Sequence, residues 1–93
     1  MDYTIIHNET SHRFETELEG HTASIEYVLR DSTINILHTW VPQPIGGRGI
    51  AAALTKYALE FARQNKLSVI PSCSYTRTYI TRHEEYQPLL KNS

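Results

Sequence analysis

The sequence predicts an α+β (α/β) fold: a mostly antiparallel, curved sheet with one parallel β-α-β crossover and two helices. Polar and apolar residues alternate between short turns in the first half of the chain, which is typical of an antiparallel meander. Apolar residues then recur every three or four positions, which is typical of an amphipathic helix. A short apolar run follows that helix, and the order strand-helix-strand implies a right-handed parallel crossover.

The first half of the chain is expected to form four strands. Glu19-Gly20-His21 reads as a hairpin turn, and residues 30–32 read as a second turn. The last strand is the longest and is rich in residues that favour strands. The expected strands cover residues 3–7, 13–18, 23–29 and 33–41.

The second half is expected to add two helices and one strand. The first helix is expected over residues 47–64, with Arg63 and Lys66 suited to its negative C-terminal end. A buried strand over residues 67–71 would place Val69 beside the 33–41 strand. A helix over residues 74–83 and a tail over residues 87–93 are expected to follow this strand.

Length and composition predict a single domain, residues 1–93. A formal net charge of −1 argues against a nucleic-acid or membrane-surface binder, because such proteins usually carry a basic excess. No signal peptide is recognisable, and no apolar stretch approaches the roughly 20 residues that span a bilayer. A lone cysteine, Cys73, predicts a free thiol and a cytoplasmic location.

The segment Val41-Pro-Gln-Pro-Ile-Gly-Gly-Arg-Gly-Ile-Ala51 leads into the first helix without a capping side chain or an acidic first turn. Arg48 instead adds positive charge there. This pattern predicts an anion site on the backbone N–H groups. The alternative is that the glycines only allow a tight turn while water caps the helix. The context argues against a dinucleotide fingerprint, because no ribose-binding acid follows, and it excludes a Walker loop, because no Gly-Lys-Ser/Thr follows.

The glycine turn resembles that of the GNAT superfamily of N-acetyltransferases, whose signature is Q/R-x-x-G-x-G/A. Residues 44–49 match it, with Pro44 in place of Gln or Arg and Gly46 in place of the Arg that often precedes the first glycine. The whole chain is similar to a small single-domain subfamily with the pattern G-x-G-I-A…P-x-C-x-Y…H-P-E-Y. Its matching segments here are residues 47–51, 58–63, 69–75 and 82–86, with Glu84 replacing the proline.

The resemblance implies an acetyl-CoA-dependent acyltransferase with a minimal GNAT-like fold. Backbone amides at the glycine turn would bind the pyrophosphate of acetyl-CoA, and the edge of the preceding strand at residues 39–41 would also bind the cofactor. The acetyl acceptor would be an unidentified amine. The implied cofactor-binding residues are Thr39, Trp40, Val41, Gly46, Gly47, Arg48, Gly49 and Ile50.

The resemblance also places the Cys73 thiol near the acetyl thioester. The start of the second helix, with Arg77 and Arg82 downstream, would favour a thiolate that accepts the acetyl group. The alternative is an inert, small buried side chain. Tyr79 is the expected general acid for the CoA thiolate, and core or rim packing is the alternative for it.

Three other residues leave alternatives open. His38 is a candidate general base or a structural histidine, and Trp40 is expected in the core or in the wall of the cofactor site. His83 is expected to cap a helix end and anchor the tail, and no metal site is expected. At the level of the whole protein, the alternative to an N-acetyltransferase is a non-catalytic acyl-CoA-binding or protein-interaction module.

Overall fold

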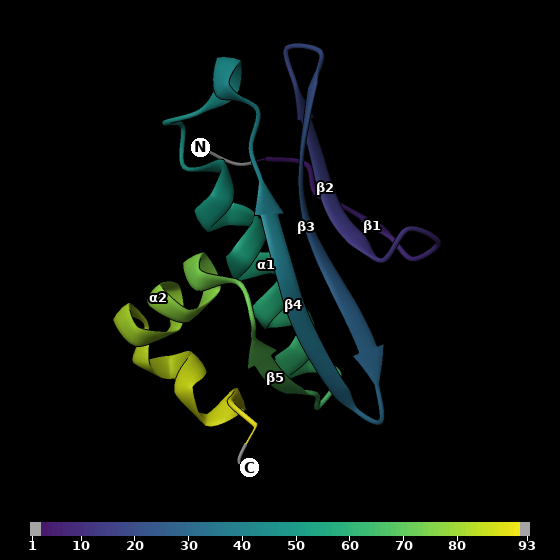
Figure 1. Cartoon of the computed structure of the whole chain (residues 1–93), viewed down its shortest axis with the longest axis vertical. Coiled ribbons are helices and arrows are strands. Elements are labelled where there is room, and N and C mark those ends of the chain that lie inside the picture. Colours follow the sequence, from purple (N-terminus) through teal and green to yellow (C-terminus); the bar gives the residue numbers. More distant parts are fainter. Residues whose placement is uncertain (1–2, 92–93) are drawn as a thin grey trace.

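The computed structural model describes residues 3–91 of the chain. One sheet of five strands lies against the long helix α1, and the shorter helix α2 lies beside α1 (Figure 1). The elements are β1 (Ile6–Asn8), β2 (Arg13–Leu18), β3 (His21–Arg30), β4 (Thr33–Trp40), the 3₁₀ helix η1 (Gln43–Ile45), α1 (Ile50–Gln64), β5 (Ser68–Pro71), α2 (Ser74–Arg82) and the 3₁₀ helix η2 (Glu84–Leu89).

The strands lie in the sheet in chain order, β1-β2-β3-β4-β5. The pairings from β1 to β4 are antiparallel, and β4 pairs with β5 in parallel. Val69 of β5 lies opposite Ile34 of β4, where the crossover was expected to place it. The predicted fold class, a mixed sheet with one parallel crossover and two main helices, is therefore confirmed.

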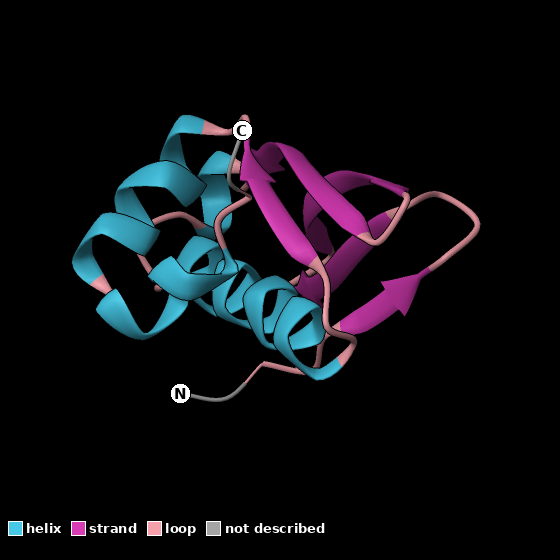
Figure 2. Cartoon of the chain, turned by 90° about the horizontal axis from the view of Figure 1, so that it is seen from below, coloured by secondary structure: helices cyan, strands magenta, loops and turns pink. Residues whose placement is uncertain are grey.

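The core fills the space between α1 and one face of the sheet (Figure 2). The helix contributes apolar residues at a spacing of three and four, so that one stripe faces the strands. Burial of each leucine or isoleucine stabilises the fold by about 1.5–3 kcal/mol. The largest fully buried side chains of this core include Phe14, Ile25, Ile34, Ile36, Leu54 and Leu59.

Helix α1 begins at Ile50 rather than at the predicted residue 47. Gly47 and Gly49 have φ angles of +75° and +76°, in the left-handed region. A right-handed helix cannot include such residues, so these glycines form a turn in front of α1. The first strand is also shifted, since β1 covers Ile6–Asn8 and not residues 3–7.

The segment predicted as a tail is partly ordered by the core. Residues 84–89 form η2, and Leu90 makes an isolated parallel bridge with Val69. Tyr86 of η2 is buried, and its hydroxyl donates a hydrogen bond of 2.7 Å to the Glu60 carboxylate on α1. The Arg63 guanidinium lies 5.0 Å from the centre of the Tyr86 ring. These contacts fasten the segment after α2 to α1.

Candidate active site

Strands β4 and β5 separate after a short parallel ladder. The ladder ends at the pair Ile36 and Pro71, and the Cys73 N–H then donates to the Ile36 carbonyl at 2.9 Å. Strand β4 continues to Trp40 and pairs there only with β3 on its other side. Within residues 3–91, no strand pairs with the opposite edge of β4 beyond that point. The main chain of residues 37–40 is therefore available to a ligand along that edge.

A β-bulge changes the direction of the side chains in this part of β4. Tyr27 pairs with Ile36 and Glu26 pairs with His38, so Leu37 has no partner on β3. The extra residue reverses the alternation of the two faces. Consequently Trp40 is 55% exposed, and the expectation that it could lie in the core is wrong.

The same bulge brings Thr39 toward the end of β5. Its Oγ1 atom lies 3.5 Å from the Cys73 Sγ atom, within hydrogen-bond distance for sulfur. Thr39 pairs with Ile25, whose side chain is in the core between the sheet and α1. His38 is exposed on the other face, so the structure does not bury it as a structural histidine.

Cys73 is the N-cap residue of α2, and its side chain is half-buried. Burial alone would raise the pKa of the thiol. The hydrogen bond from Thr39, together with the N–H groups of Thr76 and Tyr75, outweighs burial and lowers the pKa of Cys73. The thiolate is thus favoured by hydrogen bonds at the start of a helix.

The arginines expected to help the thiolate do not contribute to this shift. Arg77 donates instead to the Pro71 carbonyl at 3.3 Å, and Arg82 lines a pocket farther along α2. A residue that sequence reasoning missed is Thr76. Its side chain is fully buried beside Cys73, yet its hydroxyl lacks a hydrogen-bond partner of normal geometry among residues 3–91. The sequence does show a threonine three positions after Cys73 on a predicted helix, and this spacing could have indicated that Thr76 lies beside the thiol.

The glycine turn presents unpaired backbone donors, as the sequence predicted. Helix α1 has no capping side chain and no acidic residue in its first turn, and its first helical hydrogen bond runs from Ala53 N–H to the Gly49 carbonyl. The N–H groups of residues 50–52 therefore lack a partner within the helix. A Cβ atom at Gly47 or Gly49 would meet nothing within 4 Å, so the space beside the turn is open.

Arg48 is not a free cation in this turn. Its guanidinium forms a two-pronged ion pair with Glu19, at the tip of the β2–β3 hairpin. The hydrogen bond from Arg48 lowers the pKa of Glu19, so the pair stays charged and mutually neutralised. The Tyr3 hydroxyl also donates to the Arg48 carbonyl. Sequence reasoning missed Glu19 because 29 positions separate it from Arg48.

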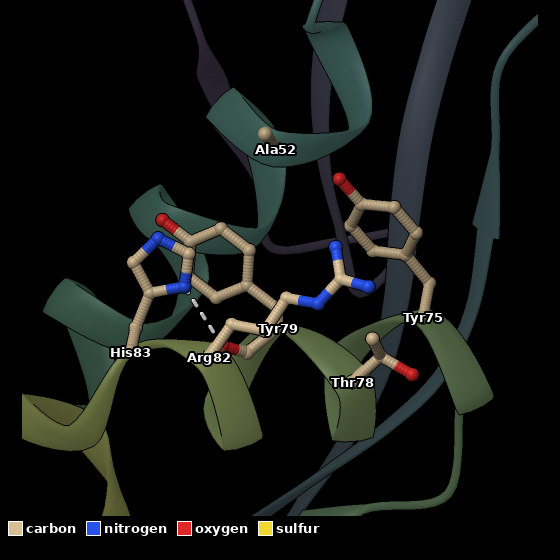
Figure 3. A pocket seen from close by; sticks show the side chains of 6 residues that line it. All are labelled: Ala52, Tyr75, Thr78, Tyr79, Arg82 and His83. Atoms are coloured by element: carbon tan, nitrogen blue, oxygen red, sulfur yellow. Dashed lines mark hydrogen bonds between the residues drawn. The ribbon is translucent and has the colours of Figure 1, made fainter.

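A pocket lies between the first turn of α1 and one face of α2 (Figure 3). Its volume is about 240 Å³. Tyr79 stacks on His83 there, with ring centres 3.9 Å apart, and burial raises the pKa of Tyr79. No hydrogen bond among the described residues joins Tyr79 to Cys73. The pocket is lined by Ala52, Tyr75, Thr78, Tyr79, Arg82 and His83.

His83 is the C-cap residue of α2, and its Nδ1 atom lies 2.8 Å from the Tyr79 carbonyl oxygen. The predicted cap of the helix end is therefore confirmed. Residues 3–91 contain no group of three or more His, Cys, Asp or Glu side chains placed to hold a metal ion. None of the helices seen in these residues has the length and apolar character needed to cross a membrane.

Comparison with known proteins shows which family this chain matches. The model of the GCN5-related N-acetyl-transferase family matches residues 13–89. Protein NATD1 of Xenopus tropicalis is 33% identical over 78 residues, which cover 80% of this chain and 71% of that protein. Protein NATD1 of Homo sapiens is also 33% identical over 78 residues, which cover 80% of this chain and 68% of that protein.

A solved structure matches nearly the whole chain. The solution NMR structure of a GCN5-like protein from Staphylococcus aureus superposes with a TM-score of 0.75 and 32% sequence identity. The match covers 98% of this chain and 90% of the other. The family model extends from β2 to η2, and thus includes the glycine turn, the divergence of β4 from β5, and Cys73. The chain belongs to the GCN5-related N-acetyltransferase (GNAT) family.

Proposed function

We propose that this protein is an acetyl-CoA-dependent N-acetyltransferase that acetylates an amine. The main observation is the separation of β4 from β5, with the Cys73 thiol held at the point where they part. The glycine turn lies at the same end of β4, because it follows that strand directly through η1. Membership of the GNAT family supports an acyltransferase at this site.

The residues fit acetyl-CoA in two places. The open edge of β4 at Thr39, Trp40 and Val41 offers backbone groups to the amides of the pantetheine arm, in the manner of an added strand. The N–H groups of residues 47–50 offer donors to the pyrophosphate, at the positive end of the α1 dipole, whereas the Gly46 N–H already donates to the Gln43 carbonyl at 3.0 Å. The exposed Trp40 ring is proposed as a wall of the cofactor site.

Two routes of acetyl transfer are compatible with this arrangement. In the direct route, the amine nitrogen attacks the thioester carbonyl, the C–S bond breaks, and the CoA thiolate takes up a proton. In the covalent route, the Cys73 thiolate attacks first and CoA leaves, which gives acetyl-Cys73. The amine then attacks this second thioester and returns the thiolate. The hydrogen bonds that lower the pKa of Cys73 support the covalent route.

Two tyrosines are available to protonate the CoA thiolate. Tyr79 is the choice from the sequence, and its raised pKa keeps it protonated at neutral pH. Tyr75 follows Cys73 by only two positions, and its hydroxyl points toward the first turn of α1 (Figure 3). We expect Tyr75→Phe to lower kcat more than Tyr79→Phe, because Tyr75 lies nearer to the thiol along α2. A larger loss in Tyr79→Phe would assign the role to Tyr79.

One observation favours the alternative, a non-catalytic acyl-CoA-binding module. No carboxylate or imidazole among residues 3–91 makes a hydrogen bond to Cys73 or Thr39, so the described site contains no evident base for the acceptor amine. The two proposals share the cofactor site and differ in turnover. Steady release of CoA in the presence of an amine panel supports the enzyme, and acetyl-CoA binding without turnover supports the module.

Calorimetric titration with CoA and acetyl-CoA tests the cofactor site. Gly47→Ala should weaken binding roughly tenfold or more, because a methyl group there prevents a phosphate from approaching the backbone donors. Gly20→Ala is the matched control. Gly20 has a φ of +78° and equally open surroundings, so both variants carry the same backbone strain. Equal affinities for CoA in the two variants would place the pyrophosphate elsewhere.

Replacement of the cysteine tests the covalent route. Cys73→Ala should retain CoA affinity and lose turnover, and intact-mass analysis of wild type with acetyl-CoA should show one added acetyl group. Unchanged turnover in Cys73→Ala would instead establish direct attack by the amine.

A further inference from the structure

The Thr76 hydroxyl is fully buried and has no hydrogen-bond partner of normal geometry among residues 3–91. A threonine in a helix often donates to the carbonyl four residues earlier. Thr55 on α1 does so, and its hydroxyl reaches the Ala51 carbonyl at 2.8 Å. Thr76 lies in the first turn of α2, so the residue four positions earlier, Ser72, is outside the helix. The Thr76 hydroxyl therefore keeps a free donor at a buried position.

This hydroxyl lies beside the Cys73 thiol. Cys73 is the N-cap residue of α2 and Thr76 is the third residue of the helix, so their side chains share one face. In many helices a side chain at the third position reaches back to the N–H of the N-cap residue. That N–H has another partner here, because it donates to the Ile36 carbonyl at 2.9 Å. The Thr76 hydroxyl is instead among the groups that act on the pKa of the thiol.

The same turn of α2 offers further donors. The first helical hydrogen bond runs from the Arg77 N–H to the Cys73 carbonyl at 3.1 Å, so the N–H groups of residues 74–76 have no partner within the helix. They lie at the positive end of the helix dipole. Thr39 approaches the sulfur from β4, with its hydroxyl 3.5 Å from the Sγ atom. Donors from two elements thus surround the thiol, and the Thr76 hydroxyl is the buried one that remains free.

Attack of the Cys73 thiolate on a thioester transfers negative charge to a new atom. The sulfur forms a bond with the carbonyl carbon, and the π electron pair of the C=O bond moves onto the oxygen. Only the carbonyl carbon separates that oxygen from the sulfur, so it comes within reach of groups around the thiol. The bond to the CoA sulfur then breaks, and the CoA thiolate takes up a proton. A free donor at this position stabilises the oxyanion more than the thioester, because the charge appears only after attack.

We propose that the Thr76 hydroxyl donates a hydrogen bond to the oxyanion that forms when Cys73 is acylated, together with the free N–H groups at the start of α2. Thr76 is thus a catalytic residue of the covalent route, and it keeps its own proton throughout. The inference rests on the proposed function, because it concerns acylation of Cys73. The role differs from that of Thr39, whose hydroxyl bonds the sulfur itself.

The test compares Thr76→Val with wild type in two kinds of reaction at the same thiol. Acetyl-CoA and p-nitrophenyl acetate acetylate Cys73 through an oxyanion, whereas iodoacetamide alkylates it at a saturated carbon and forms none. Intact mass follows both products, with Cys73→Ala as the blank. We expect Thr76→Val to slow acetylation about tenfold to a hundredfold and to leave alkylation at pH 7 within about twofold. Thr76→Ser keeps the hydroxyl and should retain most of the acetylation rate.

Two controls show whether the change is local. Thr55→Val removes a buried hydroxyl that already has a partner, and it should leave acetylation unchanged. A thermal melt of Thr76→Val should give a Tm equal to or above that of wild type, because valine has a similar shape and leaves no buried hydroxyl unpaired. A clearly lower Tm would mean that the hydroxyl is bonded in the free protein, which contradicts the inference.

The outcomes separate this inference from the proposed function. Equal acetylation rates in Thr76→Val and wild type overturn the inference, and so does an equal loss of acetylation and alkylation, which would place the effect on the thiolate. Acetylation of the wild type by p-nitrophenyl acetate but not by acetyl-CoA overturns the covalent route, while a slower reaction of Thr76→Val with that ester still supports the inference. Acetylation of the wild type by neither reagent overturns both.

Discussion

Thr39→Val removes the hydroxyl that bonds the Cys73 thiol, and leaves a β-branched side chain of similar size that suits a strand. The contact is 3.5 Å long and only part-buried, so its loss should disfavour the thiolate by about 1 kcal/mol, below the range for fully buried bonds to charged groups. Because 1.4 kcal/mol corresponds to a factor of ten, the thiolate population at pH 7 should fall about fivefold.

The assay is the rate of alkylation by iodoacetamide as a function of pH, followed by intact mass. Only the thiolate reacts, so the profile rises through the pKa of Cys73. The folded structure lowers this pKa, and the wild-type profile should therefore rise at a lower pH than that of the unfolded chain. Thr39→Val raises the pKa again and should move the profile toward higher pH. The rates should converge well above the ordinary thiol pKa of about 8.5.

Thr39→Ser is the control, because serine keeps the hydroxyl and should retain most of the wild-type rate at pH 7. Coincident profiles for Thr39→Val and wild type, with both proteins folded, would refute the reasoning. The helix start and Thr76 would then account for the lowered pKa without Thr39.

Three further variants test other parts of the structure. Tyr86→Phe removes the hydrogen bond to Glu60 and should lower stability by about 1 kcal/mol, or Tm by about 4–8 °C, in a thermal melt; an unchanged Tm would show that the bond is not formed. Glu19→Gln frees Arg48 and should increase the affinity for CoA in calorimetry, whereas a decrease would mean that the ion pair shapes the glycine turn. Trp40→Ala should change stability by no more than about 0.5 kcal/mol, because the ring is largely exposed, and should weaken CoA binding if the ring walls the cofactor site.

Much of the fold could be predicted because its elements follow from local patterns. The alternation of polar and apolar residues in the first half of the chain predicted the antiparallel meander. The recurrence of apolar residues every three or four positions in residues 50–64 predicted α1. Helix boundaries that depend on the backbone φ angle of a single residue were predicted less well. The start of α1 was placed three residues early, because the sequence shows a glycine but not which glycine adopts a left-handed conformation.

The candidate site could be predicted only in part. The glycine turn and Cys73 could be recognised as chemical features, whereas their partners could not. Thr39 is 34 positions from Cys73, and Glu19 is 29 positions from Arg48. The bulge at Leu37 decides that Thr39 rather than Trp40 faces the thiol, and strict alternation predicts the reverse.

The sequence by itself determined the order of strands and helices, the uncapped start of α1, and the cap at His83, because these depend on residues close together in the chain. Tertiary structure alone decided that Glu19 neutralises Arg48, that hydrogen bonds rather than arginines favour the Cys73 thiolate, and that Arg82 lines a pocket with the first turn of α1. Strand register and helix packing set these contacts, and both depend on burial across the whole domain.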